Sequence, residues 1–157
     1  MTLRERIAAD LKTAMKQKDT LRLSTLRLIN AAIKDRDIAL RGEGEDRQLT
    51  DAELVAVLTK MVKQRHDSAR AYEEGGRLEL VEREEAEIAV LETYLPRQLT
   101  EAETQAAIDA AMDEAGASSI RDIGAVIGLL KARHAGQMDF AVVGPMVKAR
   151  LAGGGQP

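Results

Sequence analysis

The sequence predicts an all-α protein, and three observations support this fold class. Apolar residues recur at intervals of three and four along most of the 157 residues, and no stretch alternates strictly between apolar and polar as a half-buried strand does. Signals that start and stop helices interrupt this pattern. Hydrophobic residues make up 45% and charged residues 31% of the chain, which is typical of a globular protein with a buried core.

Four helices are expected before Pro96, which stops the last of them because proline cannot donate to the preceding turn. The second runs from a cap at Asp19 to about Leu40, and its wide apolar face predicts partners on more than one side. The third opens at Thr50 with a capping box to Glu53, after a glycine-rich loop at 41–46, and ends at Gly75-Gly76. The apolar stripes are Leu3, Ile7, Leu11 and Met15 in the first helix, Leu21, Leu23, Leu26, Leu28, Ile29, Ala32 and Ile33 in the second, Leu54, Leu58, Met61, Val62, Ala69 and Tyr72 in the third, and Val81, Ile88, Leu91 and Leu95 in the fourth. The acidic run Glu82, Glu84, Glu85 and Glu87 is expected to face solvent.

Beyond Pro96 the composition shifts toward alanine and glycine and the helices shorten, which predicts a second unit. The expected division is a four-helix N-terminal domain at 1–96, a small three-helix domain at 97–152 and a disordered tail at 153–157. Expected caps are Thr100 with Glu103, Ser118 or Ser119 with Asp122, and Asp139, while Gly116 and Gly136 end helices. The middle helix carries the stripe Ile120, Ile123, Ile127 and Leu130, and beside it Gly124 and Gly128 are expected to let another helix approach closely.

Pro145 falls inside the expected last helix, whose inward residues are Val143, Val147 and Leu151. A proline there costs about 3 kcal/mol in a straight helix. The helix therefore either starts at Gly144-Pro145, with the proline in its first turn, or is kinked.

Composition excludes several function classes. Without cysteine there is no disulfide, thiol nucleophile or thiolate metal site, and the chain fits a reducing cytoplasm. No apolar run approaches the ~20 residues of a membrane span, and the amphipathic start does not resemble a secretory signal. Aromatic residues are only 2%, so base stacking is disfavoured. Residues 1–41 carry ten Lys/Arg against five Asp/Glu, whereas residues 42–99 carry eight against fourteen; this asymmetry fits either mutual neutralisation or a basic working surface.

No catalytic, metal or cofactor site is apparent from the residues. His66 and His134, the only histidines, lie in different expected units without ligand spacing. Ser118 and Ser119 have capping roles, and no serine lies in a nucleophile motif. Basic side chains remain as candidates for binding. Lys60, Lys63 and Arg70 form a stripe on the third helix.

A second basic group lies in the C-terminal unit. Lys131 and Arg133 precede Gly136 in the last turn of a helix, where the helix dipole alone explains cations. Arg121, Lys148 and Arg150 join them if the last two helices pack side by side. Such a cluster binds the phosphates of a structured RNA by shape and charge, without aromatic residues.

Several segments resemble the YqeY-like (GatB/YqeY) family in the expected order along nearly the whole chain. They are Thr25–Lys34, Met61–Ser68, Tyr72–Leu80, Glu87–Leu99 with its Tyr94-Leu95-Pro96-Arg97-Gln98-Leu99 ending, Asp122–Gly128 and Val147–Leu151. The resemblance implies a C-terminal domain similar to the tail of GatB, the B subunit of the glutamine-dependent tRNA amidotransferase. That tail helps to hold tRNA, while the chemistry occurs in domains with no counterpart here.

The resemblance therefore implies an accessory tRNA-binding module in the cytoplasm, with Arg121, Lys131, Arg133 and Lys148 contacting phosphates and no cofactor or metal. The implied partners are tRNA and an amidotransferase or synthetase protein, with no membrane. The alternative is a protein–protein adaptor without an RNA role. An enzyme in its own right, under the family label of carbon–nitrogen ligase with glutamine as amido-N donor, is a third hypothesis for which the chain shows no catalytic residues.

Overall fold

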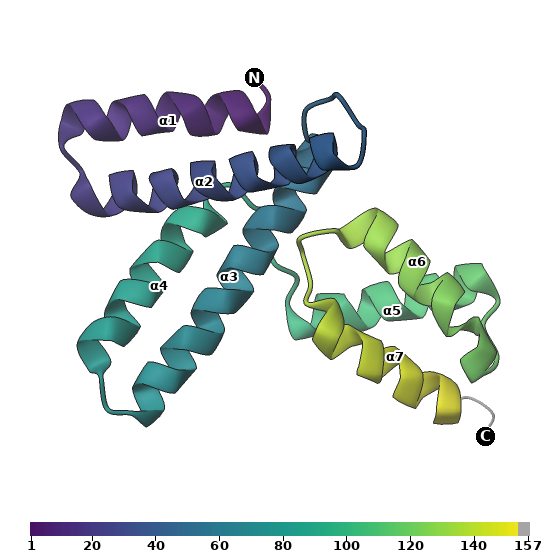
Figure 1. The fold of residues 1–157 in the computed structure, drawn as a ribbon. Coiled ribbons are helices and arrows are strands. Elements are labelled where there is room, and N and C mark those ends of the chain that lie inside the picture. Colours follow the sequence, from purple (N-terminus) through teal and green to yellow (C-terminus); the bar gives the residue numbers. More distant parts are fainter. Residues whose placement is uncertain (154–157) are drawn as a thin grey trace. The chain divides into compact units, whose positions relative to one another are not determined.

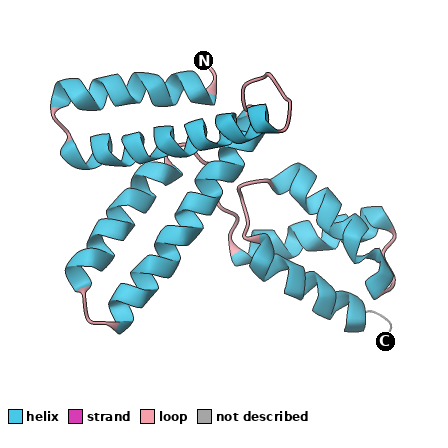
Figure 2. Cartoon of the chain, viewed as in Figure 1, coloured by secondary structure: helices cyan, strands magenta, loops and turns pink. Residues whose placement is uncertain are grey.

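The computed structural model describes residues 1–153 and groups the chain into two compact units, one ending at Leu95 and the other beginning at Pro96. The sequence-based domain boundary lies one residue later, after Pro96. Within the described range every regular element is a helix (Figures 1 and 2), which confirms the all-α prediction.

The N-terminal unit contains four α-helices: α1 (Leu3–Gln17), α2 (Thr20–Gly42), α3 (Asp51–Glu74) and α4 (Leu78–Glu92). In Figure 1, α1 lies along α2, and α3 and α4 form a helical hairpin. Their apolar stripes meet in one core, made of Ile7, Ala14, Leu26, Ile29, Ile33, Leu40, Leu49, Leu54, Leu58, Met61, Leu91 and Tyr94. The helix α4 ends four residues before Pro96, so the proline does not itself end the helix as predicted.

Polar contacts fix α1 against its neighbours. Arg4 forms a two-pronged ion pair with Asp37 of α2, with N–O distances of 3.0 and 3.1 Å. The Asp10 carboxylate forms an ion pair with the Arg22 guanidinium, at 3.5 Å, and accepts a hydrogen bond from the Tyr94 hydroxyl, at 2.6 Å. Burial, reinforced by the Asp10 carboxylate, raises the pKa of Tyr94 to about 12.

A buried ion pair joins the two helices of the α3–α4 hairpin. Arg65 Nε lies 3.0 Å from a carboxylate oxygen of Glu87, and Glu87 is only 7% exposed. The prediction that the whole acidic run of α4 faces solvent is therefore wrong at Glu87. Because both partners are largely desolvated, removing either one leaves an uncompensated charge in the hairpin.

The apolar face of the first two helices is narrower than predicted. Met15 is 53% exposed, Leu21 40% and Leu28 46%, so these three residues do not belong to the core. Leucine and methionine at helical spacing look the same in sequence whether or not a partner helix covers them. The covered side of α2 is centred on Leu26, Ile29 and Ile33. The prediction that this helix has several partners is confirmed, since α2 contacts α1, α3 and α4.

The C-terminal unit contains α5 (Glu101–Ala115), a short 3₁₀ turn η1 (Ile120–Asp122), α6 (Ile123–His134) and α7 (Phe140–Gly153). Its separate core consists of Ile108, Ala111, Val126, Leu130, Met138, Val143, Val147 and Leu151. The segment leading into α5 is tied to the α6–α7 connection, because the Leu99 amide donates to the Gln137 carbonyl at 2.9 Å and the Gln137 side chain donates to the Arg97 carbonyl at 3.1 Å.

The predicted capping boxes are confirmed. In each, the threonine hydroxyl accepts the backbone N–H of the glutamate, and the glutamate carboxylate accepts the threonine N–H, at Thr50–Glu53 and again at Thr100–Glu103. Hydrogen-bonded salt bridges from Arg47 to Glu53 and from Arg97 to Glu103, together with the threonine amides, lower the pKa of each glutamate to about 2. Asp139 also caps as predicted, since its carboxylate accepts the Ala141 amide at 2.9 Å.

Other expectations for the C-terminal unit need correction. The last helix begins at Phe140, so it does not start at Gly144-Pro145, and Pro145 lies inside it. Ile120, placed in the buried stripe by its spacing, is 44% exposed because it belongs to the 3₁₀ turn before α6. Gly153, assigned to a disordered tail, is the last residue of α7, and residues 154–157 lie outside the described range.

Candidate nucleic-acid interface

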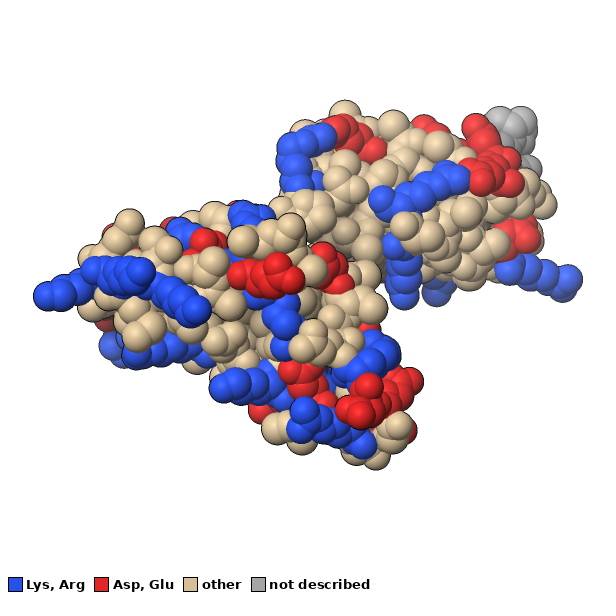
Figure 3. Space-filling model, turned by 90° about the horizontal axis from the view of Figure 1, so that it is seen from above, with Lys and Arg blue, Asp and Glu red and all other residues tan. Residues whose placement is uncertain are grey.

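The four basic residues predicted to contact phosphates lie on three elements of the C-terminal unit. Arg121 is in η1, Lys131 and Arg133 are in the last turns of α6, and Lys148 is in the second half of α7. All four are exposed. On the face seen in Figure 3, basic side chains of this unit are separated by uncharged and acidic surface and do not merge into one patch.

Ion pairs remove some of these cations from the free surface. Arg133 of α6 pairs with Glu114 of α5. Arg150 of α7 pairs with Asp109, which also lies in α5. Both arginines therefore attach the last two helices to α5. Arg133, predicted as a phosphate ligand, would have to exchange its carboxylate for a phosphate in order to bind one.

Lys131 projects to a different side of α6 from Arg133. The two residues are two positions apart, which on a helix separates side chains by more than half a turn. The ammonium group of Lys131 lies 5.8 Å from the centre of the Phe140 ring, at the start of α7. This cation–π contact places the ammonium group near the start of α7, and no ion pair of Lys131 occurs among the described residues.

Arg121 and Lys148 complete a set of three cations without a carboxylate partner in the described part of this unit, where the ion pairs involve Arg97, Arg133 and Arg150. The elements that carry the three contact one another, since η1 packs against both α6 and α7 and these two helices pack together. The structure thus places Arg121, Lys131 and Lys148 on elements that contact one another and pairs Arg133 with Glu114 of α5.

Two glycines lie between these cations on α6. Gly124 and Gly128 are exposed, and a Cβ atom added to either would meet no atom within 4 Å. The prediction that they admit a closely packed helix of this chain is therefore wrong. Gly124, Gly128 and Lys131 are four and three positions apart, so they share one side of α6, and Arg121 lies three positions before Gly124 in the turn η1. We call this surface the α6 glycine face.

The titratable groups with shifted pKa values serve as caps and ion pairs. The pKa of Asp122 is lowered because its carboxylate accepts the amides of Ser118, at 2.9 Å, and Ser119, at 3.2 Å. His134 Nδ1 lies 3.1 Å from the side-chain oxygen of Gln137, which is a local contact at the helix end. Among residues 1–153 no group of three His, Asp or Glu side chains is placed to hold a metal ion.

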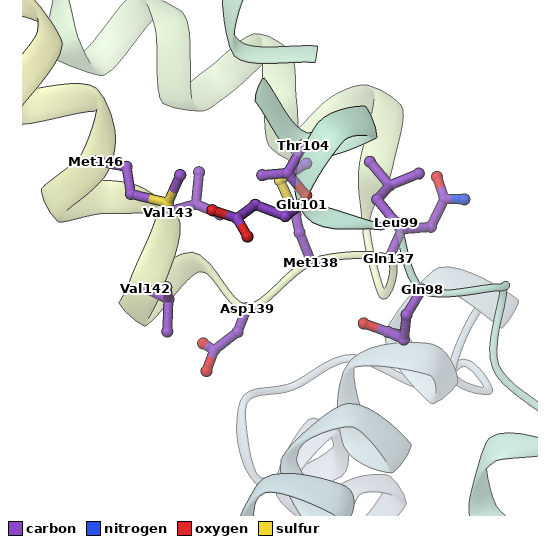
Figure 4. Close-up of a pocket in the computed structure, with 10 residues that line it drawn as sticks. All are labelled: Gln98, Leu99, Glu101, Thr104, Gln137, Met138, Asp139, Val142, Val143 and Met146. Carbon is purple, nitrogen blue, oxygen red and sulfur yellow. The ribbon is translucent and has the colours of Figure 1, made fainter. Parts of the chain in front are cut away.

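An open apolar depression of about 330 Å³ lies between the start of α5 and the start of α7. Figure 4 shows the Glu101 carboxylate extending over it toward Val143 and Met146. Val142, on its rim, is 58% exposed. Sequence reasoning missed this feature because its lining comes from segments about 40 positions apart, and only the apolar Met138 and Val142 beside the cap at Asp139 hinted at it.

These features define a class of all-helical proteins with an N-terminal four-helix unit and a small C-terminal helical unit that exposes cations on its last two helices. The family model described as "Yqey-like protein" matches residues 4–151, and the chain belongs to this family.

Curated relatives match over part of the chain. The stretch shared with the mitochondrial protein "altered inheritance of mitochondria protein 41" of Lachancea thermotolerans is 38% identical over 86 residues, covering 55% of this chain and 44% of the relative. The protein of the same name from Kluyveromyces lactis is 39% identical over 85 residues, covering 54% and 44%. The match therefore spans less than half the length of these relatives. No helix within residues 1–153 is long and apolar enough to cross a membrane.

Proposed function

We propose that the C-terminal unit is an RNA-binding module that holds folded tRNA by its phosphate backbone, as an accessory to a protein that acts on that tRNA. The observation that carries this proposal is the α6 glycine face together with Lys148. Three cations there lack a carboxylate partner among the described residues of the unit, while Arg133 and Arg150 are occupied by α5. Such contacts hold RNA by charge and shape and need no aromatic residues.

The bare glycines support the same proposal. A glycine inside a helix costs about 1 kcal/mol relative to alanine, and at Gly128 no internal contact explains that cost. Without a side chain, the helix backbone can come close to a rigid partner such as an RNA backbone. Arg121 and Lys131, on either side of the glycines, could then contact phosphates at separate points along the RNA backbone.

The partner protein and the place of action follow from the resemblance and remain proposals. An amidotransferase or a synthetase is the kind of enzyme that would use a separate tRNA-holding module, and glutamine-dependent carbon–nitrogen ligation would then belong to that enzyme. The cytoplasmic location remains our prediction, while the names of these two relatives place those proteins in mitochondria.

Fluorescence anisotropy of a labelled, folded tRNA with the full chain tests the RNA proposal. The variant R121E/K131E/K148E should bind at least about tenfold more weakly at 0.1 M salt, and its slope of log K against log salt should be shallower by about 3, one for each phosphate contact. The matched control K60E/K63E/R70E changes charge equally on α3, whose basic stripe is not part of the proposed RNA surface, and should retain most of the affinity. Equal affinity and slope for the C-terminal variant and the wild type would contradict the proposal.

A protein–protein adaptor is the second candidate, and the apolar depression beside Glu101 is the observation that favours it. Its exposed Val142 and acidic rim suit a partner segment with an apolar side chain next to a basic one. Val142→Glu should abolish a protein interaction made there without changing tRNA affinity. A stable complex that survives nuclease treatment and is lost in this variant would favour the adaptor.

A further inference from the structure

The positive charge of residues 1–41 lies mainly on the outward side of the α1–α2 pair. Two of the five acidic residues in this range are used inside the pair, where Asp37 binds Arg4 and Asp10 binds Arg22. A third, Asp19, caps α2 by accepting the Arg22 amide at 3.2 Å. The sequence left open whether the acidic residues 42–99 neutralise this segment or whether the segment forms a basic surface. No ion pair of the described residues joins a cation of 1–41 to an acid of 42–99, which favours the surface.

Four cations form two rows, one on each helix of the pair. Lys12 and Lys16 are one helical turn apart on α1, opposite the buried Ile7 and Ala14. Arg27 and Lys34 are seven positions apart on α2, away from the buried side of that helix, and about 10.5 Å apart along its axis. All four are exposed.

The α1–α2 turn extends the rows with a fifth cation. Lys18 ends α1 in the left-handed conformation, with φ 56°, and is the only residue other than glycine with positive φ in the described range. Glycine is the usual residue at such a position, and a side chain there costs roughly 1 kcal/mol. We call Lys12, Lys16, Lys18, Arg27 and Lys34 the α1–α2 basic face. Seen from above, Figure 3 shows basic side chains gathered over the end of this helix pair where α1 and α2 are joined.

The chemistry of this face favours RNA over two other anionic partners. An anionic membrane surface binds helices that offer a large apolar side. The main apolar sides of α1 and α2 are buried in the core, and the large apolar residues exposed on these two helices are Met15, Leu21, Leu28 and Ile38. A protein partner would be expected to find aromatic anchors, and residues 1–41 contain no Phe, Trp or Tyr. Rows of cations without anchors match a phosphate backbone.

We propose, building on the RNA-binding function proposed above, that the α1–α2 basic face is a second RNA-binding surface and that the protein holds one RNA with both of its units. Two weak contacts on one chain raise the overall affinity beyond either alone, since the second contact forms at a high effective concentration. Each unit then contributes a separate share of the salt dependence.

The test uses the full chain, a labelled folded tRNA and three charge-reversal variants that each change three cations: K12E/R27E/K34E, R121E/K131E/K148E and K60E/K63E/R70E. K12E/R27E/K34E should weaken binding by at least about tenfold at 0.1 M salt and reduce the salt slope by about 3, whereas K60E/K63E/R70E on α3 should retain most of the affinity. Far-UV circular dichroism confirms that each variant is folded. The neutral variant K12Q/R27Q/K34Q should lose affinity to a smaller extent.

The outcomes separate the two RNA proposals. If only the Arg121, Lys131 and Lys148 variant loses affinity, the C-terminal module stands and the second surface is overturned. If only the α1–α2 variant loses affinity, the face is supported and the C-terminal site fails. If the α1–α2 and α3 variants lose affinity equally, the effect is one of net charge and the face is overturned. A last outcome concerns binding of the wild-type protein to phosphatidylserine vesicles. If the α1–α2 variant loses this vesicle binding but keeps its affinity for tRNA, the face is a membrane-binding surface and the RNA proposal for it is overturned.

Discussion

Replacing Gly128 by alanine should stabilise the C-terminal unit and weaken its binding to RNA at the same time. Gly128 lies in the middle of α6, is exposed, and leaves open space where a Cβ would lie. The methyl group therefore adds helix propensity without a clash, worth about 1 kcal/mol. For a unit of this size that gain raises the unfolding midpoint by about 4–8 °C.

Gly116 provides a matched control. It also has open space around its Cβ position, but its φ is 61° because it ends α5 in the left-handed conformation. Gly116→Ala should therefore destabilise the unit by about 1 kcal/mol. The two substitutions add the same methyl group in equally open surroundings, so their opposite signs isolate the backbone conformation.

Urea denaturation of the full chain measures both variants. Tyr72 and Tyr94 both lie in the N-terminal unit, so tyrosine fluorescence follows that unit while circular dichroism at 222 nm follows both. Gly128→Ala should shift only the unfolding of the C-terminal unit. This transition is seen in the circular dichroism but not in the tyrosine fluorescence. A neutral or destabilising effect would refute the assignment of Gly128 as an exposed helix residue without internal contacts. Unchanged tRNA affinity in the stabilised variant would refute close approach of RNA to the α6 glycine face.

Three further substitutions test the contacts of the fold. Tyr94→Phe removes a 2.6 Å hydrogen bond to Asp10 and should cost about 2 kcal/mol in urea denaturation; because the folded pKa of Tyr94 is about 12, stability should fall as pH rises from about 10 toward 12, and an unshifted absorbance titration would contradict this. The folded pKa of Glu103 is about 2 against an ordinary value of 4.5, so its contribution to the free energy of unfolding is present above pH 4.5 and is lost as the pH falls toward 2. Glu103→Gln should remove this pH dependence, and Glu101→Gln should leave it. Equal stability–pH profiles for the two variants would argue against the cap. Pro145 is exposed inside α7, so Pro145→Ala restores a backbone donor and should stabilise the unit by up to about 3 kcal/mol in urea denaturation; unchanged or lower stability would contradict this.

Local signals in the sequence were sufficient for the fold class and most helix ends. The capping boxes at Thr50 and Thr100 and the positive-φ glycines Gly116 and Gly136 act within a few residues, so the pattern alone locates them. Burial depends on which partner covers a helix side. Met15 and Leu28 have the spacing of core residues, but no helix in their unit covers them.

The candidate site was predictable only as a list of cations. The sequence placed Lys131 and Arg133 at one helix end, but only the structure shows that Glu114 of α5 pairs with Arg133. The spacing of Gly124 and Gly128 is compatible with a surface against which another helix packs or with an exposed surface. Only the positions of the neighbouring helices decide between these two possibilities. The α1–α2 basic face likewise required knowing that Asp10 and Asp37 are engaged inside the helix pair.

Lysine footprinting tests the central claim most directly. The full chain is treated with an amine-reactive acetylating reagent with and without folded tRNA, and mass spectrometry measures the modification of each of its eight lysines. Binding through both surfaces predicts that tRNA protects Lys131 and Lys148 in one unit and Lys12, Lys16 and Lys34 in the other, while Lys60 and Lys63 on α3 stay fully reactive. Uniform protection of all lysines, or none at saturating tRNA, would contradict binding of RNA at these two surfaces.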